Sequence, residues 1–114
     1  MGHTDTICVA DCGLPIPNNV EKIDITISIG KPMFLEVISE ISKNMEVERI
    51  TLAKEIIDVN APVLEGIKDL FPKAEIEFVS HEELKAISSK CKAIIRTGEA
   101  TPFANAILHS GVIF

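Results

Sequence analysis

Tryptophan and tyrosine are both absent from this sequence of 114 residues, which contains five phenylalanines. A hydrophobic core must therefore be filled mainly by isoleucine, valine, leucine and phenylalanine, and the pattern predicts that Phe34, Phe71 and Phe78 are core residues. Hydrophobic residues still make up 46% of the chain, which is too many for a disordered protein and enough for a core. At this length we expect one domain that spans residues 1–114.

Basic residues are also few, with 11 lysines and arginines against 17 aspartates and glutamates, for a formal net charge of -6. They form no cluster, which argues against a nucleic-acid partner because such partners require a basic footprint. The apolar runs are too short to span a membrane, and the N-terminus lacks the basic and apolar regions of a signal peptide. We therefore expect a cytoplasmic protein with no nucleic-acid or membrane partner.

Only three cysteines occur, Cys8, Cys12 and Cys91. The odd number argues against a disulfide framework, and without a second cysteine pair the sequence does not favour structural zinc. The chain also lacks a GxGxxG fingerprint, an HExxH motif and a GxSxG elbow. We expect reduced cysteines in or near the core, and neither a metal nor a cofactor.

What the sequence does contain is an alternation of apolar β-type runs with helical patterns. The helical patterns cover 31–45, 60–71 and 80–90, where Asn60 and Ser80 are suitable N-caps. Such alternation implies crossover connections. It predicts an α/β fold of three layers, with a largely parallel, Rossmann-like sheet flanked by helices. The expected strands are 6–10, 23–29, 49–53, 75–80, 92–97 and the last run, which starts at residue 105.

Polar residues follow several of these strands, at the edge where α/β sheets bind ligands. Asp11 follows the first strand, and His81 follows the fourth and opens a helix. Either residue can also be read as purely structural, Asp11 in an Asx-turn onto Gly13 and His81 as a helix start. His3 precedes its strand, so a site that it shares with Asp11 would require a neighbouring subunit.

In this order, the segments "GHTD", "DCGLPIP", "VERITLAKEI", "SHEELK" and "IRTGEATPFANAILHSGVIF" resemble the D-ribose pyranase family, which is related to the fucose mutarotases. The resemblance runs from residue 2 to residue 114. It implies a ribose pyranase-like fold and cofactor-free interconversion of the pyranose and furanose forms of D-ribose. It also implies ring-shaped homo-oligomers, typically decamers, with the active site between adjacent subunits.

The resemblance also implies roles for single residues. His3 matches the proposed proton donor of the Gly-His-Thr-Asp motif. The residues that match sugar-binding positions are Asp11, His81, Phe103, Ala104 and Asn105.

The chain departs from the family pattern in three ways. Phe103 stands where the family has tyrosine, so a hydroxyl is missing, and Lys54 stands where relatives usually carry an acidic residue. The family also has a helical leading segment before Gly-His-Thr-Asp, whereas this sequence begins at Met1.

The expected reaction opens and recloses a hemiacetal ring by acid-base catalysis, with His3 as the acid. The base is left open between a bound water and a second histidine. Three alternatives remain: a fucose-type mutarotase, a non-catalytic sugar-binding or scaffold protein, and a metal site on His3, Asp11 and His81. We further expect an Arg96–Glu99 ion pair at a subunit interface and a structural His109. The apolar C-terminal run is expected in an interface or in the sheet.

Overall fold

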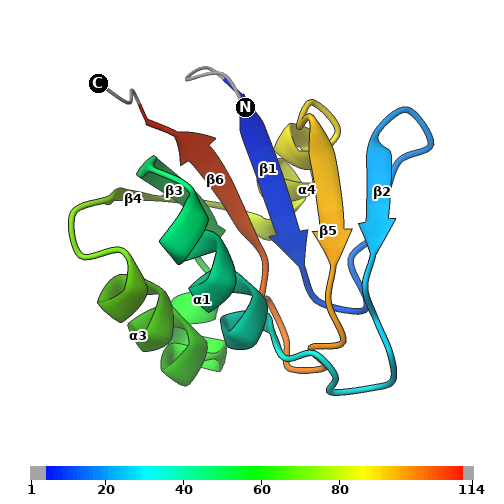
Figure 1. Ribbon diagram of the computed structural model, residues 1–114, viewed down its shortest axis with the longest axis horizontal. Helices are drawn as coiled ribbons and strands as arrows, with labels where there is room; N and C mark the ends of the chain where they lie inside the picture. The colour runs from blue at the N-terminus through cyan, green and yellow to red at the C-terminus, as the bar shows by residue number, and fades with distance from the viewer. Residues whose placement is uncertain (1–4, 112–114) are drawn as a thin grey trace.

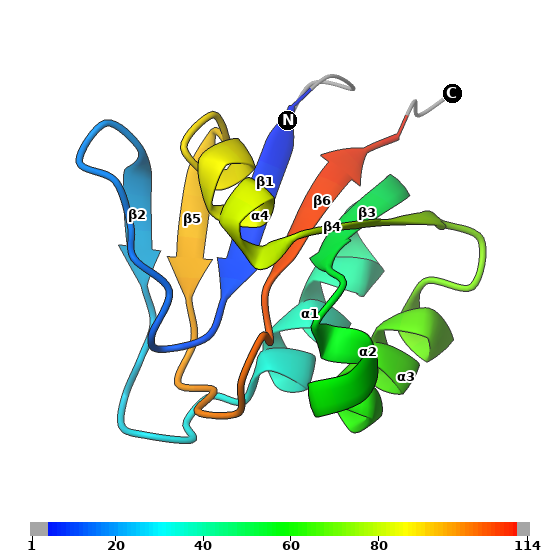
Figure 2. The same cartoon turned by 180° about the vertical axis from the view of Figure 1, so that it is seen from behind.

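The computed structural model describes residues 5–111, and the predictions for His3 and for residues 112–114 lie outside this range. Six strands form one sheet in the order β2-β5-β1-β6-β3-β4. Helices α1 and α3 cover one face, and α4 covers the other (Figures 1 and 2), so the predicted three layers are confirmed. The elements in chain order are β1 (Thr6–Ala10), β2 (Glu21–Asp24), α1 (Phe34–Asn44), β3 (Val47–Ala53), α2 (Ile56–Val59), α3 (Ala61–Leu70), β4 (Glu75–Val79), α4 (His81–Ser88), β5 (Ala93–Arg96) and β6 (Ala106–Ser110).

The sheet is largely parallel, as predicted, and its exception is β6. Strand β1 pairs in parallel with β5, as do β2 with β5 and β3 with β4, whereas β6 lies antiparallel between β1 and β3. The cause is the link from β5 to β6, residues 97–105, which contains no crossover helix to return the chain to the opposite edge. This link therefore remains at the carboxyl edge of the parallel strands, beside Asp11.

Strand β2 is shorter than its alternating sequence predicts. The prediction of a strand over 23–29 is wrong, because pairing ends at Asp24, opposite Arg96, the last residue of β5. The carboxylate of Asp24 then accepts the N–H of Thr26 at 3.0 Å and starts a turn. The next isoleucines have no strand beside them, and Ile27 and Ile29 are each 82% exposed.

The core lies on both faces of the sheet. One cluster, between the sheet and α1 and α3, is centred on side chains such as Phe34, Ile50 and Leu108. The other, under α4, includes Cys8 and Leu84. The predicted burial of Phe34 and Phe71 is confirmed, but Phe78 is 39% exposed because β4 is an edge strand with a partner on one side.

Candidate functional site

The site is built around a reciprocal pair between Asp11, after β1, and Asn105, before β6. The backbone N–H of Asp11 donates to Asn105 Oδ1 at 2.9 Å, and Asn105 Nδ2 donates to Asp11 Oδ2 at 3.3 Å. The other carboxylate oxygen of Asp11 accepts the N–H of Gly13 at 3.0 Å, which is the predicted Asx-turn. The Asp11 side chain is thus fixed at the carboxyl edge of the sheet.

Burial raises the pKa of the Asp11 carboxyl above its ordinary value. The backbone N–H groups of Gly13 and Leu14 and the amide of Asn105 oppose this rise, and so does the nearby His81. These donors therefore favour the ionised form of the carboxyl, against the effect of burial.

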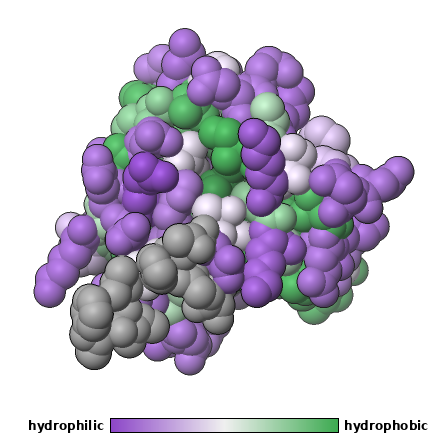
Figure 3. Space-filling model, turned by 90° about the horizontal axis from the view of Figure 1, so that it is seen from above, coloured by the Kyte–Doolittle hydropathy of each residue, from purple (hydrophilic) through white to green (hydrophobic). Residues whose placement is uncertain are grey.

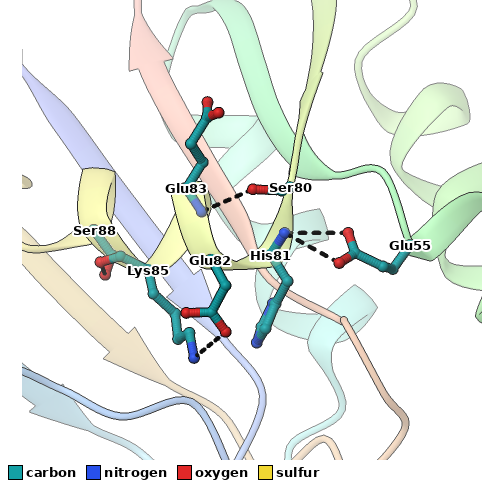
Figure 4. A network of polar contacts seen from close by, with 7 residues as sticks. All are labelled: Glu55, Ser80, His81, Glu82, Glu83, Lys85 and Ser88. Carbon is teal, nitrogen blue, oxygen red and sulfur yellow. Dashed lines mark hydrogen bonds and ion pairs between the residues drawn. The ribbon is translucent and has the colours of Figure 1, made fainter.

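His81 is the first residue of α4 and forms the second wall of the site. Its backbone N–H donates to both carboxylate oxygens of Glu55, at 3.1 and 3.2 Å, and Figure 4 shows Glu55 beside this helix start. The hydroxyl of Ser80 accepts the N–H of Glu83 at 3.1 Å, so the predicted N-cap of α4 is confirmed. The imidazole Nδ1 is buried and has no hydrogen-bond partner among residues 5–111.

Phe103 forms the third wall. Its ring meets the His81 ring edge to face, with 5.0 Å between centroids and an angle of 82° between planes. The backbone of Phe103 has a φ of 60°, in the left-handed region that costs a non-glycine residue about 1–3 kcal/mol. Such a conformation persists where neighbouring contacts impose it. Here Asn60 Nδ2 donates to Thr101 Oγ1 at 2.8 Å and to the Pro102 carbonyl at 2.9 Å.

These walls enclose a small pocket of about 190 Å³, lined by Asp11, Gly13, Leu14, His81 and Phe103. It is smaller than the roughly 300–1,000 Å³ of drug-sized ligand sites, which suits a small polar molecule. The structure therefore brings together three of the predicted residues, Asp11, His81 and Phe103. Ala104 is fully buried in the core, and Asn105, at 1% exposed, supports Asp11 from behind; neither lines the pocket of this chain.

The N-terminal end of β1 lies at the edge opposite this pocket (Figure 1). Thr6 and Ala10, at the two ends of β1, are separated by about 13 Å at the usual rise of a strand. The role predicted for His3 concerns a residue outside the described range.

Within residues 5–111 of one chain, Arg96 and Glu99 do not form an ion pair with each other. Arg96 pairs with Asp24 at 3.3 Å. Glu99 is buried, and its carboxylate accepts the N–H of Phe34, the first residue of α1, at 2.8 Å and the hydroxyl of Thr101 at 2.7 Å. A carboxylate is favoured at this end of a helix by the helix dipole. Glu99 therefore joins α1 to the loop that carries Phe103.

His109 has structural contacts, as predicted. Its ring nitrogens lie 3.3 Å from Arg49 and 2.9 Å from the Thr51 hydroxyl, on β3. Burial and the nearby Arg49 lower the pKa of His109. Cys8 and Cys91 are buried, and all three cysteines are free.

Neither a metal centre nor a membrane span is found in the part of the chain that the structure describes. Within 5–111, no group of three or more histidine, cysteine, aspartate or glutamate side chains is placed to hold a metal ion. Over the same residues, no helix is both long and apolar enough to cross a bilayer. Lys54 is exposed, and nothing in the structure explains its departure from the family pattern.

Fold and site together define an α/β protein with a small polar pocket at the carboxyl edge of its parallel strands. Residues 1–113 match the RbsD / FucU transport protein family, and the chain belongs to that family. It is 55% identical over 114 residues to a D-ribose pyranase of Bacillus cereus (strain B4264) and 54% identical to one of Bacillus anthracis (strain CDC 684 / NRRL 3495). Each match covers 100% of this chain and 87% of the relative.

Solved structures agree with this assignment. Bacillus subtilis RbsD complexed with D-ribose superimposes with a TM-score of 0.98 at 45% identity, over 100% of this chain and 87% of that one. The fucose mutarotase of Streptococcus pneumoniae in complex with L-fucose matches with a TM-score of 0.79 at 24% identity, over the same shares. The second likeness shows the shared fold.

Several residues support the pocket through contacts that the sequence does not predict. Glu55 and Asn60 precede and follow α2, a helix that the periodicity does not predict, and Glu99 and Thr101 lie in a turn-rich segment. The bonds from Glu55 to His81, from Asn60 to Thr101 and from Glu99 to Phe34 join residues 26 to 65 positions apart in the chain. Only the folded topology brings them to the site.

Proposed function

We propose that this protein is a D-ribose pyranase, a cofactor-independent isomerase that interconverts the pyranose and furanose forms of D-ribose. The observation that carries the proposal is the likeness to ribose-bound RbsD along the whole chain, at 45% identity. The pocket supports it, because a carboxylate and an imidazole at its walls are groups that bind sugar hydroxyls. Curated relatives at 54–55% identity carry the same activity name.

The reaction conserves all atoms. A base removes the proton of the anomeric hydroxyl, the bond between C1 and the ring oxygen breaks, and an acid protonates the departing ring oxygen. The open aldehyde rotates, and the C4 hydroxyl adds to C1 in the reverse sequence of proton transfers. In this proposal His3 is the acid, and Asp11, His81 and Phe103 contact the sugar, while Ala104 and Asn105 contribute from behind the pocket. The base is a bound water or a second histidine, and His81 is a histidine that lines the pocket.

The proposal includes a ring-shaped homodecamer in the cytoplasm. A site that uses both His3 and Asp11 needs two subunits, because β1 separates them. Hydrophobic side chains are available for an interface: an apolar groove of about 470 Å³ runs between α1 and the β2–β5 edge. Figure 3 shows exposed hydrophobic residues at the lower right of the molecule, which is the side of β2 and β5 in Figure 1. The free cysteines suit a reducing compartment.

Saturation-transfer NMR tests the activity directly. We expect the protein to accelerate exchange between the ring forms of D-ribose, and His3→Ala to slow this exchange at least about 100-fold, the low end of general acid-base catalysis. His109→Gln is the matched control, because it removes a histidine that lies outside the pocket. Faster exchange of fucose alone would indicate the fucose-type mutarotase, and sugar binding without exchange would indicate the non-catalytic protein. Light scattering that reports a monomer would refute the shared site.

A further inference from the structure

The segment between β3 and α3 contacts the pocket from behind without lining it. At one end of this segment, the Glu55 carboxylate accepts the backbone N–H of His81 with both oxygens. At the other end, Asn60 Nδ2 donates to Thr101 and to the Pro102 carbonyl, immediately before Phe103. The single turn of α2 joins these two residues. One short segment thus holds the two aromatic walls of the pocket.

Glu55 acts on the start of α4. The two contacts place a negative charge beside the first N–H of a helix, where the helix dipole favours it. They fix the backbone from which the His81 side chain emerges, and Figure 4 shows the imidazole extending from this point. Glu55 itself follows the last strand residues of β3, where Lys54 N–H donates to the Val79 carbonyl at 2.7 Å, so its position is set by the sheet.

Asn60 acts on the loop before β6. Asn60 is 6% exposed. Its backbone is fixed by two hydrogen bonds, since its N–H donates to the Ile56 carbonyl and its carbonyl accepts the N–H of Leu64. Its amide therefore presents two donors from a fixed position. These donors hold Thr101 and Pro102 and so help to impose the left-handed backbone of Phe103.

The two restraints converge on one pair of rings. His81 and Phe103 meet edge to face at 5.0 Å, and with the ring in this position Nδ1 has no partner among residues 5–111. A buried polar atom without a partner is unfavourable, so the ring would gain by turning away if it were free to do so. Contacts with neighbouring residues must therefore hold the His81 ring in this position.

We propose that Glu55 and Asn60 are positioning residues, which hold the His81 and Phe103 rings so that the His81 imidazole faces a sugar hydroxyl in the pocket. The proposal rests on the proposed function in one respect, that the pocket holds the sugar. Neither residue lines the pocket. Their removal therefore acts through His81 and Phe103 and not by loss of a direct contact.

The test combines ribose exchange with the NMR signal of the His81 ring in the sugar-free protein, assigned by His81→Gln. The Phe103 ring current displaces this signal, and Phe103→Leu supplies the value without that neighbour. We expect Glu55→Ala to move the signal toward the Phe103→Leu value and to lower the exchange rate and ribose affinity together by about tenfold, as for a misplaced binding group. The matched control is Glu65→Ala, which removes an exposed carboxylate on α3 that is paired with Lys68. Glu65→Ala should leave the His81 signal, the exchange rate and the ribose affinity unchanged.

Asn60→Asp keeps the side-chain size and removes both donors, and Asn44→Asp does the same at the end of α1, where Nδ2 donates to the Glu40 carbonyl. We expect the first variant to move the His81 signal and weaken ribose binding, and the second to leave both unchanged. If Glu55→Ala does not fold, Glu55→Gln decides, because it retains one acceptor and should show part of the displacement.

An unmoved His81 signal in the folded Glu55 and Asn60 variants, or ribose affinity within twofold of the parent, would overturn the proposal. The ring signal does not depend on turnover. An inactive parent protein would therefore refute the proposed function while the positioning roles would still be judged by the signal.

Discussion

Replacing Asn105 by aspartate puts a second carboxyl group against Asp11. The donated hydrogen bond from Nδ2 is lost, and an oxygen takes its place at about the same 3.3 Å. Two unit charges at this separation repel by about 5 kcal/mol at an effective dielectric constant of 20, which is an upper limit because Asp11 is only partly buried. The pair will therefore retain one proton to well above the ordinary range of a carboxyl group.

The consequence is a change in how stability depends on pH. In the parent protein the pKa of Asp11 is already raised by burial, so the folded state binds more protons than the unfolded state, and stability falls as pH rises through that raised pKa. Asn105→Asp extends to higher pH the range over which the folded state binds the extra proton. We expect its free energy of unfolding to match the parent within about 1 kcal/mol near pH 4 and to fall below it by about 2–4 kcal/mol near pH 7.

Urea unfolding at several pH values measures this difference, and carbon NMR of the carboxyl groups reports the shared proton directly. Asn105→Ala is the control, since it removes the hydrogen bond donated by Nδ2, and also the one accepted by Oδ1, without adding a charge. If Asn105→Asp and Asn105→Ala lose stability in parallel at every pH, the two side chains are not in contact as described. The interpretation of the site as a coupled pair would then be refuted.

Two further predictions concern neighbouring parts of the molecule. Phe103→Tyr restores the family's hydroxyl, and we expect it to tighten ribose binding by about 0.5–1.5 kcal/mol, the net value of one hydrogen bond. An unchanged dissociation constant in an NMR titration would mean that residues 103–105 act through their backbone. His109 has a pKa lowered by burial and by Arg49, so the unfolded state binds the proton more readily, and stability is lost as pH falls below about 6.5. His109→Gln should abolish this part of the loss in unfolding experiments, and an unaltered pH profile would contradict the contacts assigned to His109.

Local sequence patterns were sufficient for most of the fold. The helices α1, α3 and α4 lie within the predicted ranges, because each has an apolar stripe at helical spacing and caps or prolines at its start. The alternation over 23–29 wrongly predicted a strand of that length, because a strand also needs a pairing partner and β5 ends opposite Asp24. Phe78 misled in the same way, since hydrophobicity alone does not distinguish an edge strand from a central one.

The candidate site divides along similar lines. Asp11 and His81 could be placed from the rule that ligands bind at the carboxyl ends of parallel strands. The partners of Glu99 could not be predicted from the sequence. Arg96, three residues away, offers an opposite charge, and only the fold shows that Glu99 contacts the start of α1 instead. Hydrogen bonds between segments remote in sequence leave no periodicity that could be read.

The placement of β6 has a consequence for how the protein is made. Among the elements described in residues 5–111 this strand comes last in sequence, yet it lies inside the sheet and joins the β2-β5-β1 half to the β3-β4 half. A nascent chain that lacks residues 106–110 would expose the inner edges of both halves, including β1 and β3. Synthesis must therefore pass residue 110 before the sheet closes, and a truncation within β6 should produce an aggregation-prone chain with two open edges rather than a shortened protein.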